Sequence, residues 1–191
     1  MTLTTKDCEA IINKYPFLKP RNVWTGEEDP EYDYSYLAGM WEIPEGWHRL
    51  FLLYCKHIHP HLERANMLDK YTFTQVKEKY GTLRIYDSGY PKSAYYLADL
   101  FESFSKYVCP ICGRYPTKYE TAGWVTYLCE ECAEESSCVM FSITKQKYMH
   151  IESWSNNTAE HIMISYKNIK KEYEYIRSMS DEEFIAYILK D

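Results

Sequence analysis

Four cysteines stand as two closely spaced pairs in the middle of the chain. Cys109 and Cys112 form the pair CPIC, and Cys129 and Cys132 form the pair CEEC, with sixteen residues between the pairs. Each Cys-x-x-Cys pair offers two thiolates from one tight turn, and four thiolates complete a tetrahedron around Zn²⁺. The spacing therefore predicts one zinc ion bound by these four side chains.

The residues around the two pairs favour a structural zinc site. Gly113 follows the first pair, where a knuckle needs a positive φ. Residues 117–120 and 124–128 flank Ala122-Gly123 as a hairpin, and the glutamates after Cys129 suit a helix N-terminus. A knuckle, a hairpin and a helix start are typical of a treble-clef or zinc-ribbon module. Four thiolates leave no open ligand position, so the predicted zinc is structural.

An acidic segment lies in residues 16–43, which we predict to be mostly loop with short strands. Five carboxylates fall within seven residues: Glu27, Glu28, Asp29, Glu31 and Asp33, interleaved with and followed by Tyr32, Tyr34 and Tyr36. One interpretation is a solvated loop. The other is an acidic, aromatic surface that imitates a nucleic-acid backbone toward a basic partner.

Basic residues gather in residues 71–86, where the composition predicts a β-hairpin with Gly81 in the turn. Lys77, Lys79 and Arg84 form a compact basic cluster interleaved with aromatic residues. Such a cluster can hold phosphates or an acidic partner, although on a hairpin it is more often a solvated face.

Three histidines, His57, His59 and His61, look at first like a second metal site. They follow an apolar stripe that predicts a helix from Pro44 to about residue 58. Pro60 is expected to break that helix, so His57 and His61 would not share one helical face. We therefore predict a polar helix end. We also do not count Cys138 among the predicted zinc ligands.

The remaining helices are predicted from caps and apolar periodicity. Thr4 and Asp7 form a capping box for a helix that ends at Pro16, and Ser180 and Glu183 form another for the last helix. Further helices are expected between residues 93 and 108 and over residues 166–177. Polar and apolar residues alternate in residues 139–165, which predicts two or three strands.

These elements predict an α+β fold, with helices packed on a small antiparallel sheet beside the four-cysteine module. We divide the chain into an α+β body over residues 1–107, a zinc module over residues 108–138 that shares the same core, and a C-terminal strand-helix extension over residues 139–191.

The composition is that of a globular chain without an overall basic character. Of its 191 residues 46% are hydrophobic and 26% are charged, and the net charge is −6. A surface that binds nucleic acid throughout should be basic, so this charge argues against one. The 20 tyrosines suit the edge of a core, and some of them suit a contact surface.

The chain carries no feature of an exported or membrane protein. No apolar run approaches the roughly 18 residues needed to span a bilayer. The N-terminus lacks the basic start and apolar stretch of a secretory signal. In a chain without export signals, seven cysteines indicate metal binding rather than disulfides. We therefore expect a cytoplasmic protein without a membrane partner.

Several segments together resemble a widespread family of bacterial and phage proteins. They are GWHRLFLLYC at 46–55, QVKEKYGTLRIY at 75–86, CPICG at 109–113 and GWVTYLCEEC at 123–132. The pattern is similar to QVKEKFGTLRFY, CxxCG and GWxxTLCxxC in that family, with Tyr80 and Tyr86 in place of the usual Phe. The resemblance implies a zinc-knuckle architecture and a viral or mobile-element context in the cytoplasm of a bacterial host. It implies no chemistry.

That context predicts a non-enzymatic, zinc-containing binding protein. Small acidic phage proteins often act by occluding a host defence enzyme, so the expected partner is a host protein, and an anti-CRISPR role against an RNA-guided CRISPR nuclease is the specific hypothesis. The sequence offers no nucleophile with a base and no open metal site. The alternative is a zinc-stabilised nucleic-acid-binding or regulatory protein that uses Lys77, Lys79 and Arg84. Residues 109–135 carry two basic residues against five glutamates, which is the wrong sign for a zinc module that contacts nucleic acid directly.

Overall fold

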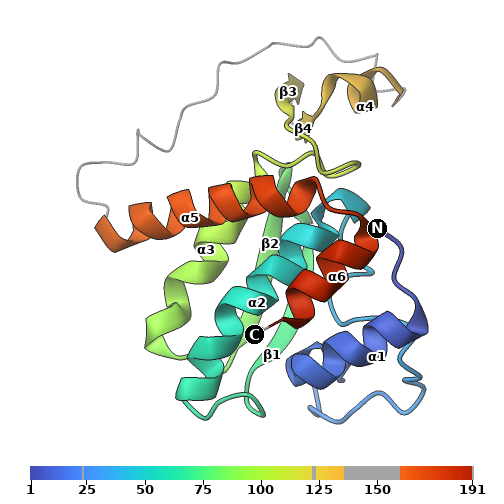
Figure 1. The fold of residues 1–191 in the computed structure, drawn as a ribbon, viewed down its shortest axis with the longest axis vertical. Helices are drawn as coiled ribbons and strands as arrows, with labels where there is room; N and C mark the ends of the chain where they lie inside the picture. The colour runs from blue at the N-terminus through green and yellow to red at the C-terminus, as the bar shows by residue number, and fades with distance from the viewer. Residues whose placement is uncertain (23, 122–123, 136–159, 191) are drawn as a thin grey trace.

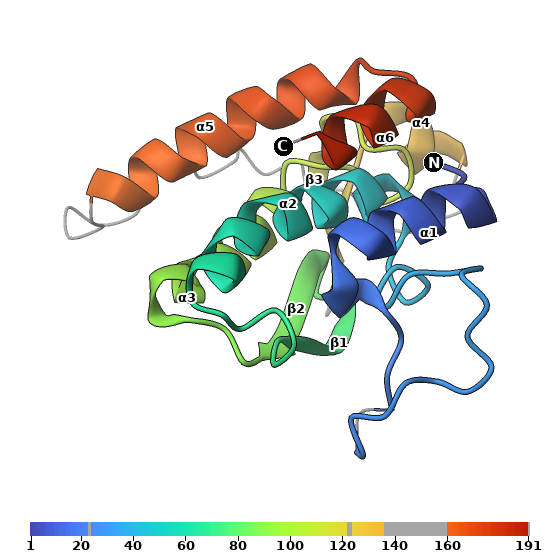
Figure 2. The ribbon, with the colours of Figure 1, turned by 60° about the horizontal axis from the view of Figure 1, so that its bottom comes forward.

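A computed structural model describes residues 1–22, 24–121, 124–135 and 160–190 of the chain. These residues form six α-helices and two antiparallel sheets of two strands each. The fold is α+β, as the sequence predicts. In Figure 2 the hairpin of residues 72–88 forms one layer, with helix α2 (His48–Arg64) over it and helix α3 (Tyr95–Ser105) beside it. Helices α5 (Glu160–Arg177) and α6 (Asp181–Leu189) form the layer above α2.

The N-terminal helix α1 (Thr5–Lys14) begins at the predicted capping box. The Asp7 amide donates to the Thr4 Oγ1 over 3.2 Å, and the Thr4 amide donates to the Asp7 carboxylate over 2.9 Å. The helix buries Ile11 and Ile12 and ends before the short 3-10 turn η1 (Pro16–Leu18). The sequence predicts short strands within residues 16–43. The described residues of that segment form only one isolated β-bridge, between Arg21 and Glu28.

Helix α2 (His48–Arg64), which follows the 3-10 turn η2 (Glu45–Trp47), corrects one prediction. It continues through Pro60, where the sequence predicted a break. Proline removes one backbone hydrogen bond near the end of the helix. Ile58 and Leu62 flank it one turn apart, and both are fully buried. The burial of these two side chains compensates for the lost hydrogen bond.

Strands β1 (Thr72–Lys79) and β2 (Thr82–Ser88) form the predicted hairpin. Its two-residue turn places Tyr80 and Gly81 at φ values of 54° and 76°, the left-handed conformation that suits the twist of a tight hairpin. Leu83 and Ile85 are buried on the face toward the core. On the opposite face Lys79 and Tyr86 are exposed, whereas Thr82 next to the turn is buried.

Helix α3 (Tyr95–Ser105), which follows the 3-10 turn η3 (Lys92–Ala94), covers the outer edge of β2. The Leu83 amide donates to the Ser105 hydroxyl over 2.9 Å, and the Ile85 amide donates to the Glu102 carboxylate over 2.8 Å. Side chains of the helix thus take the place of a third strand on this edge.

The C-terminal helices are α5 (Glu160–Arg177) and α6 (Asp181–Leu189). Residues 160–165, predicted as strand, belong to α5 instead. Tyr166, Ile169, Tyr173 and Ile176 form its buried stripe, and the partly buried Ile162 extends that stripe by one turn at helical spacing. The predicted strand residues before 160 lie outside the described residues. Helix α6 begins at the predicted Ser180 and Glu183 capping box.

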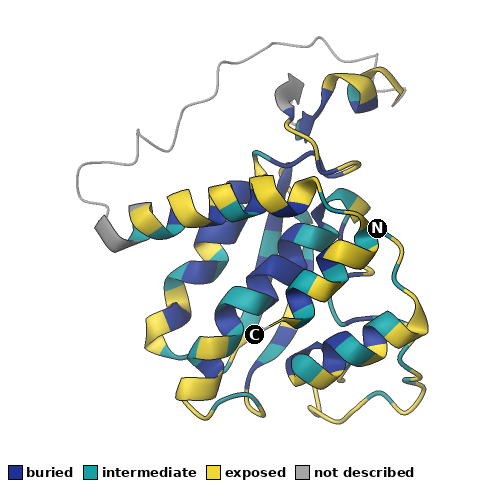
Figure 3. Cartoon of the chain, viewed as in Figure 1, coloured by how far each residue is buried: buried dark blue, intermediate teal, exposed yellow. Residues whose placement is uncertain are grey.

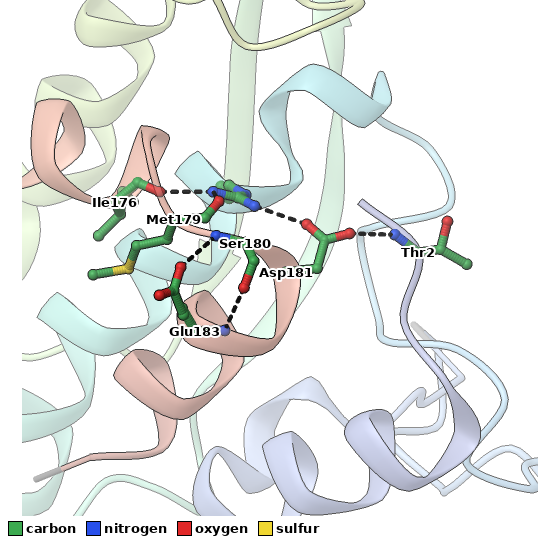
Figure 4. A network of polar contacts seen from close by, with 7 residues as sticks. Thr2, Ile176, Met179, Ser180, Asp181 and Glu183 are labelled. Carbon is green, nitrogen blue, oxygen red and sulfur yellow. Dashed lines mark hydrogen bonds and ion pairs between the residues drawn. The ribbon is translucent and has the colours of Figure 1, made fainter.

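Arg49 of α2 holds the turn between α5 and α6. Its guanidinium donates to the carbonyls of Ile176 and Met179 over 2.6 and 2.9 Å and pairs with the Asp181 carboxylate at 2.8 Å. Figure 4 shows this network, in which Asp181 also accepts a hydrogen bond from the Thr2 amide. The C-terminal helices are thereby joined to both α2 and the start of the chain.

One apolar core contains buried residues from α1, α2, α3, α5, α6 and the first hairpin. Figure 3 shows the buried sides of these helices facing one another. Cys109, Leu128, Cys129 and Cys132 form a second, smaller cluster. The described residues of α5 and α6 share the first core with the body, while the three-part division of the chain stays a prediction. No helix in the described part of the chain is long and apolar enough to span a membrane.

Candidate metal centre

The four cysteines of the two pairs lie together and can hold a metal ion. Their sulfur atoms all lie within 4.8 Å of one another, and Cys112 Sγ is 3.4 Å from Cys129 Sγ. All four are free thiols. Zn–S bonds of about 2.3 Å in a tetrahedron put sulfur atoms about 3.8 Å apart, so this spacing fits a zinc ion. We call Cys109, Cys112, Cys129 and Cys132 the four-cysteine cluster.

The first knuckle, residues 109–114, is closed by its own backbone. The Cys109 amide donates to the Arg114 carbonyl over 2.7 Å, and the Gly113 amide donates to the Cys109 carbonyl over 2.8 Å. Gly113 has a φ of 76°, the positive value that the sequence predicts there. Glycine adopts this conformation without steric cost, which allows the chain to turn back around the sulfur atoms.

The second pair is delivered by a hairpin and a short helix. Strands β3 (Thr117–Thr121) and β4 (Trp124–Leu128) pair antiparallel, and α4 (Glu130–Glu135) begins directly after Cys129. The Ala133 amide donates to the Cys129 carbonyl over 2.9 Å, so Cys132 lies in the first helical turn. The predicted hairpin strands and helix start are present, and the turn at 122–123 lies outside the described residues. Assignment to the treble-clef class stays a prediction.

Arg114 supplies positive charge next to the sulfur atoms. Its Nε lies 3.3 Å from Cys112 Sγ, and its other guanidinium nitrogen pairs with the Glu131 carboxylate at 2.5 Å. Desolvation would raise the pKa of the Cys112 thiol, but hydrogen bonds from the Arg114 side chain and amide lower that pKa to about 7. The thiolate is the form that binds metal. Sequence reasoning did not find this role for Arg114, although it stands two residues after Cys112.

Gly46 and Trp47 attach the first knuckle to the body. The Gly46 amide donates to the Pro110 carbonyl over 2.7 Å, and the buried Trp47 indole donates to the Val108 carbonyl over 2.8 Å. A Cβ at Gly46 would lie 2.3 Å from the Cys109 carbonyl oxygen. Only glycine allows the two backbones to approach this closely.

Helix α5 supports the knuckle from the other side. The Tyr173 hydroxyl donates to the Gly113 carbonyl over 3.2 Å, and the Tyr115 hydroxyl donates to Glu174 over 2.6 Å. The Arg177 guanidinium lies 4.3 Å from the centre of the Tyr115 ring. Sequence reasoning missed these contacts because nothing in the local pattern links α5 to residues 109–115.

The tip of the first hairpin packs against β4. A Cβ at Gly81 would lie 2.8 Å from the Val125 carbonyl oxygen and 3.0 Å from the Tyr127 ring. Segments that are far apart in sequence therefore lie next to one another: Gly46 lies against residues 109–110, and Gly81 lies against residues 125–127.

The acidic residues 27–33, which we call the acidic loop, lie away from this centre. Figure 2 shows the loop of which they are part extending beyond α1 and β1. The Glu28 carboxylate pairs with Lys19 at 2.5 Å, and Asp29 accepts a hydrogen bond of 2.7 Å from the Tyr36 hydroxyl. The hydrogen bond from Lys19 lowers the pKa of Glu28, and that from the Glu31 amide lowers the pKa of Asp29. Both groups are therefore anions at neutral pH.

The remaining acidic-loop residues, Glu27, Glu31 and Asp33, are exposed. No cation within the described ranges forms an ion pair with these three carboxylates. Asp29 also pairs with no described cation, because its hydrogen-bond partners, the Glu31 amide and the Tyr36 hydroxyl, are neutral.

Lys77, Lys79 and Arg84 lie together on the solvent side of the first hairpin, with Lys77 directly opposite Arg84. Arg84 pairs with Glu102 at 2.7 Å. The Lys77 and Lys79 ammonium groups lie 5.6 and 5.4 Å from the ring centres of Tyr86 and Tyr80. We call Lys77, Lys79 and Arg84 the basic face. Of the three positive charges on the basic face, that of Arg84 is already paired with Glu102.

The three histidines of α2 each have a different neighbour. His57 contacts Glu172 at 2.6 Å, His61 contacts the Ser93 hydroxyl at 3.1 Å, and His59 packs on the Tyr15 ring. In the part of the chain that the structure describes, the four-cysteine cluster is the one group that can hold a metal. Cys138 lies outside that part.

In comparisons with known proteins, no family model, no curated protein and no solved structure matches the chain. Its function is therefore inferred from the geometry of its own residues.

Proposed function

We propose that this chain is a non-enzymatic binding protein of phage or mobile-element type that inhibits a host defence nuclease by direct protein–protein contact. The proposed target is an RNA-guided CRISPR effector in the cytoplasm of a bacterial host. The four-cysteine cluster would hold one structural Zn²⁺. The observation that carries the proposal is the exposed, unpaired negative charge of the acidic loop.

A bound metal ion would support this function by making the fold that carries the binding surface more rigid. Four thiolates would complete the coordination of zinc and leave no position for a substrate or a water molecule. Its chemistry when bound is therefore structural, and it would fix the first knuckle against Gly46 and Tyr173. A binding surface gains affinity when its scaffold is rigid, because less conformational entropy is lost on association.

The acidic loop supports a basic partner surface. Glu27, Glu31 and Asp33 are exposed without cation partners among the described residues. The channel of a nuclease that holds nucleic acid is basic. Carboxylates that meet such a surface accelerate association and exclude the nucleic acid that normally occupies it.

The test is cleavage of target DNA by a purified CRISPR effector with its guide RNA, in the presence of this protein. We expect inhibition, and we expect the triple variant Glu27→Gln, Glu31→Gln, Asp33→Asn to inhibit at least about tenfold less well. The matched control is Glu9→Gln, Glu63→Gln, Asp69→Asn, which makes the same change of charge at three other exposed positions and should inhibit normally. Absence of inhibition across a panel of effector types, with no rescue of phage in a defended strain, would contradict the proposal.

A second candidate function is binding of single-stranded nucleic acid on the basic face. The observation that favours it is that Lys77 and Lys79 share this face with Tyr80 and Tyr86, whose side chains are 68% and 41% exposed. Exposed aromatic rings can stack on bases while cations hold phosphates.

The test of this second function is the salt dependence of binding to a single-stranded oligonucleotide. The variant Lys77→Gln, Lys79→Gln should lower the slope of log K against log salt by about 1.4, since each phosphate contact contributes about 0.7. The variant Lys167→Gln, Lys170→Gln on the exposed side of α5 should leave it unchanged. Equal slopes for both variants would exclude the basic face.

A further inference from the structure

The two outer edges of the first hairpin differ. The two-residue turn makes Lys79 and Thr82 a hydrogen-bonded pair, so the pairs Glu78–Leu83 and Val76–Ile85 direct their backbone groups away from the partner strand. On β2 these outward amides are bonded by α3 through Ser105 and Glu102. The edge of β2 is therefore closed.

In the described part of the chain, no comparable hydrogen bonds cover the edge of β1. No hydrogen bond joins the backbone of Val76 or Glu78 to another segment in the described parts of the chain, and no third strand pairs with β1 there. Backbone groups at a free edge are a template for an added strand.

A cleft with a volume of about 570 Å³ runs along this edge. It is lined by residues 72–76 of β1, by Asp29, and by residues from the segments 17–21 and 36–42. Trp41 lines the cleft with its side chain 70% exposed. Five residues at about 3.3 Å per residue span about 16 Å. The cleft therefore has the place and length for a short extended segment, with an indole available to cover one of its side chains.

The charge around the cleft selects a basic occupant. Residues 17–42 contain six carboxylates and two cations, and both cations, Lys19 and Arg21, already lie within ion-pair distance of Glu28. Asp29 and Glu42 line the cleft and pair with no cation in the described ranges. An incoming lysine or arginine would find both carboxylates unneutralised.

We propose that an extended, basic segment of a partner protein binds in this cleft as a third strand on β1. Its backbone would pair with that of Val76 and Glu78, an apolar side chain would lie on Trp41, and its basic side chains would face Asp29 and Glu42. This inference deepens the proposed function and rests on it for the kind of partner, since it names the form in which a basic protein is recognised.

The probes are three fluorescein-labelled hexapeptides. The first alternates lysine and valine, the second alternates glutamate and valine, and the third is the lysine peptide with its valine amides N-methylated. We expect saturable binding of the lysine peptide by fluorescence anisotropy, and affinities at least about tenfold weaker for the other two. In amide-correlated NMR spectra the lysine peptide should shift the amides of Val76 and Glu78 and the Trp41 indole.

Two tryptophan variants locate the site. Trp41→Ala should weaken binding of the lysine peptide by about tenfold, because it removes an exposed aromatic wall of the cleft. Trp24→Ala removes an even more exposed indole that does not line the cleft and should stay within about twofold of the unmodified protein.

Equal affinity for the lysine and N-methylated peptides, equal effects of the two tryptophan variants, or no binding of the lysine peptide would each overturn strand addition, even if a nuclease is inhibited. Peptide binding with this pattern but without inhibition of any nuclease would support strand addition and refute the nuclease target. The two proposals therefore fail by different measurements.

Discussion

The Tyr173 hydroxyl donates a hydrogen bond of 3.2 Å to the carbonyl of Gly113, sixty residues earlier in the chain. Tyr173 is buried in α5, and Gly113 closes the first knuckle of the four-cysteine cluster. The C-terminal helix therefore takes part in shaping the metal centre. Folding of residues 109–114 and docking of α5 should be coupled.

Loss of this hydroxyl should destabilise the protein. Tyr173→Phe leaves the ring in place but removes the donor to a buried carbonyl, which costs about 1 kcal/mol. Tyr175→Phe on the same helix is the control, because that side chain is 61% exposed and should change stability by less than about 0.5 kcal/mol. Urea unfolding measures both. Equal midpoints for the two variants would mean that the bond to Gly113 does not stabilise the fold.

A side chain at Gly46 should displace the first knuckle. In Gly46→Ala the new Cβ would lie 2.3 Å from the Cys109 carbonyl oxygen and 2.6 Å from the Pro110 carbonyl carbon. Both atoms belong to the backbone and cannot rotate away, so we expect a loss of about 1–3 kcal/mol and faster loss of metal to a chelator. Thermal unfolding and a chelator competition assay check the two effects.

Gly26→Ala is the control for this variant. Gly26 has a φ of 72°, and no atom lies within 4 Å of the position that a Cβ would take there. Alanine at this position should therefore lower the stability by only about 1 kcal/mol, because the left-handed backbone conformation is unfavourable for alanine. Metal release should be unchanged. If the two alanine variants released metal at the same rate, close approach of Gly46 to the knuckle would not matter for the centre.

The parts of the fold that depend on neighbouring residues could be predicted from the sequence. The caps at Thr4 and Ser180 and the tight turn at Gly81 are local: each depends on side chains three or fewer residues apart. The α+β class follows from these elements and their apolar periodicity. Each Cys-x-x-Cys pair is equally local, and the presence of two such pairs predicts the four-cysteine cluster without the structure.

The parts that depend on contacts between distant segments could not be predicted. Pro60 breaks a helix by local rules, yet the buried Ile58 and Leu62 hold α2 together on both sides of it. Polar and apolar residues alternate enough in residues 160–165 to indicate a strand. Ile162 instead continues the apolar stripe of α5, which packs on the core as a helix. The anchors at Gly46 and Tyr173 connect elements whose proximity no short pattern reveals.

Metal analysis should find about one zinc ion per chain. Cys109→Ser places a weaker ligand at a fully buried position of the four-cysteine cluster, and structural zinc contributes on the order of 10 kcal/mol in small modules. We therefore expect loss of the metal and a large fall in the unfolding temperature. Cys8→Ala changes a buried cysteine outside the cluster and should retain the metal. A folded, metal-free Cys109→Ser protein would refute the structural role.

The Arg49–Asp181 pair should make stability depend on pH in acid. Desolvation would raise the pKa of the Asp181 carboxyl, but hydrogen bonds from Arg49 and from the Thr2 amide outweigh it and hold that pKa below its usual value. Because the pKa is depressed on folding, the contribution of Asp181 is fully present above the unfolded pKa and is lost as pH falls through the folded one. The difference in stability between the unmodified protein and Asp181→Asn should therefore be constant above about pH 5 and shrink below about pH 4.

Arg49→Met should remove the whole network at neutral pH. It leaves the carbonyls of Ile176 and Met179 without their donor, and loss of charged hydrogen bonds in a half-buried site costs about 2–3 kcal/mol. Arg64→Met on the same helix changes an exposed arginine and should cost less than about 0.5 kcal/mol. Urea unfolding at pH 7 compares the two. Because Arg49 joins α2 to the turn between α5 and α6, a normal midpoint for Arg49→Met would show that this network does not stabilise the docking of the C-terminal helices.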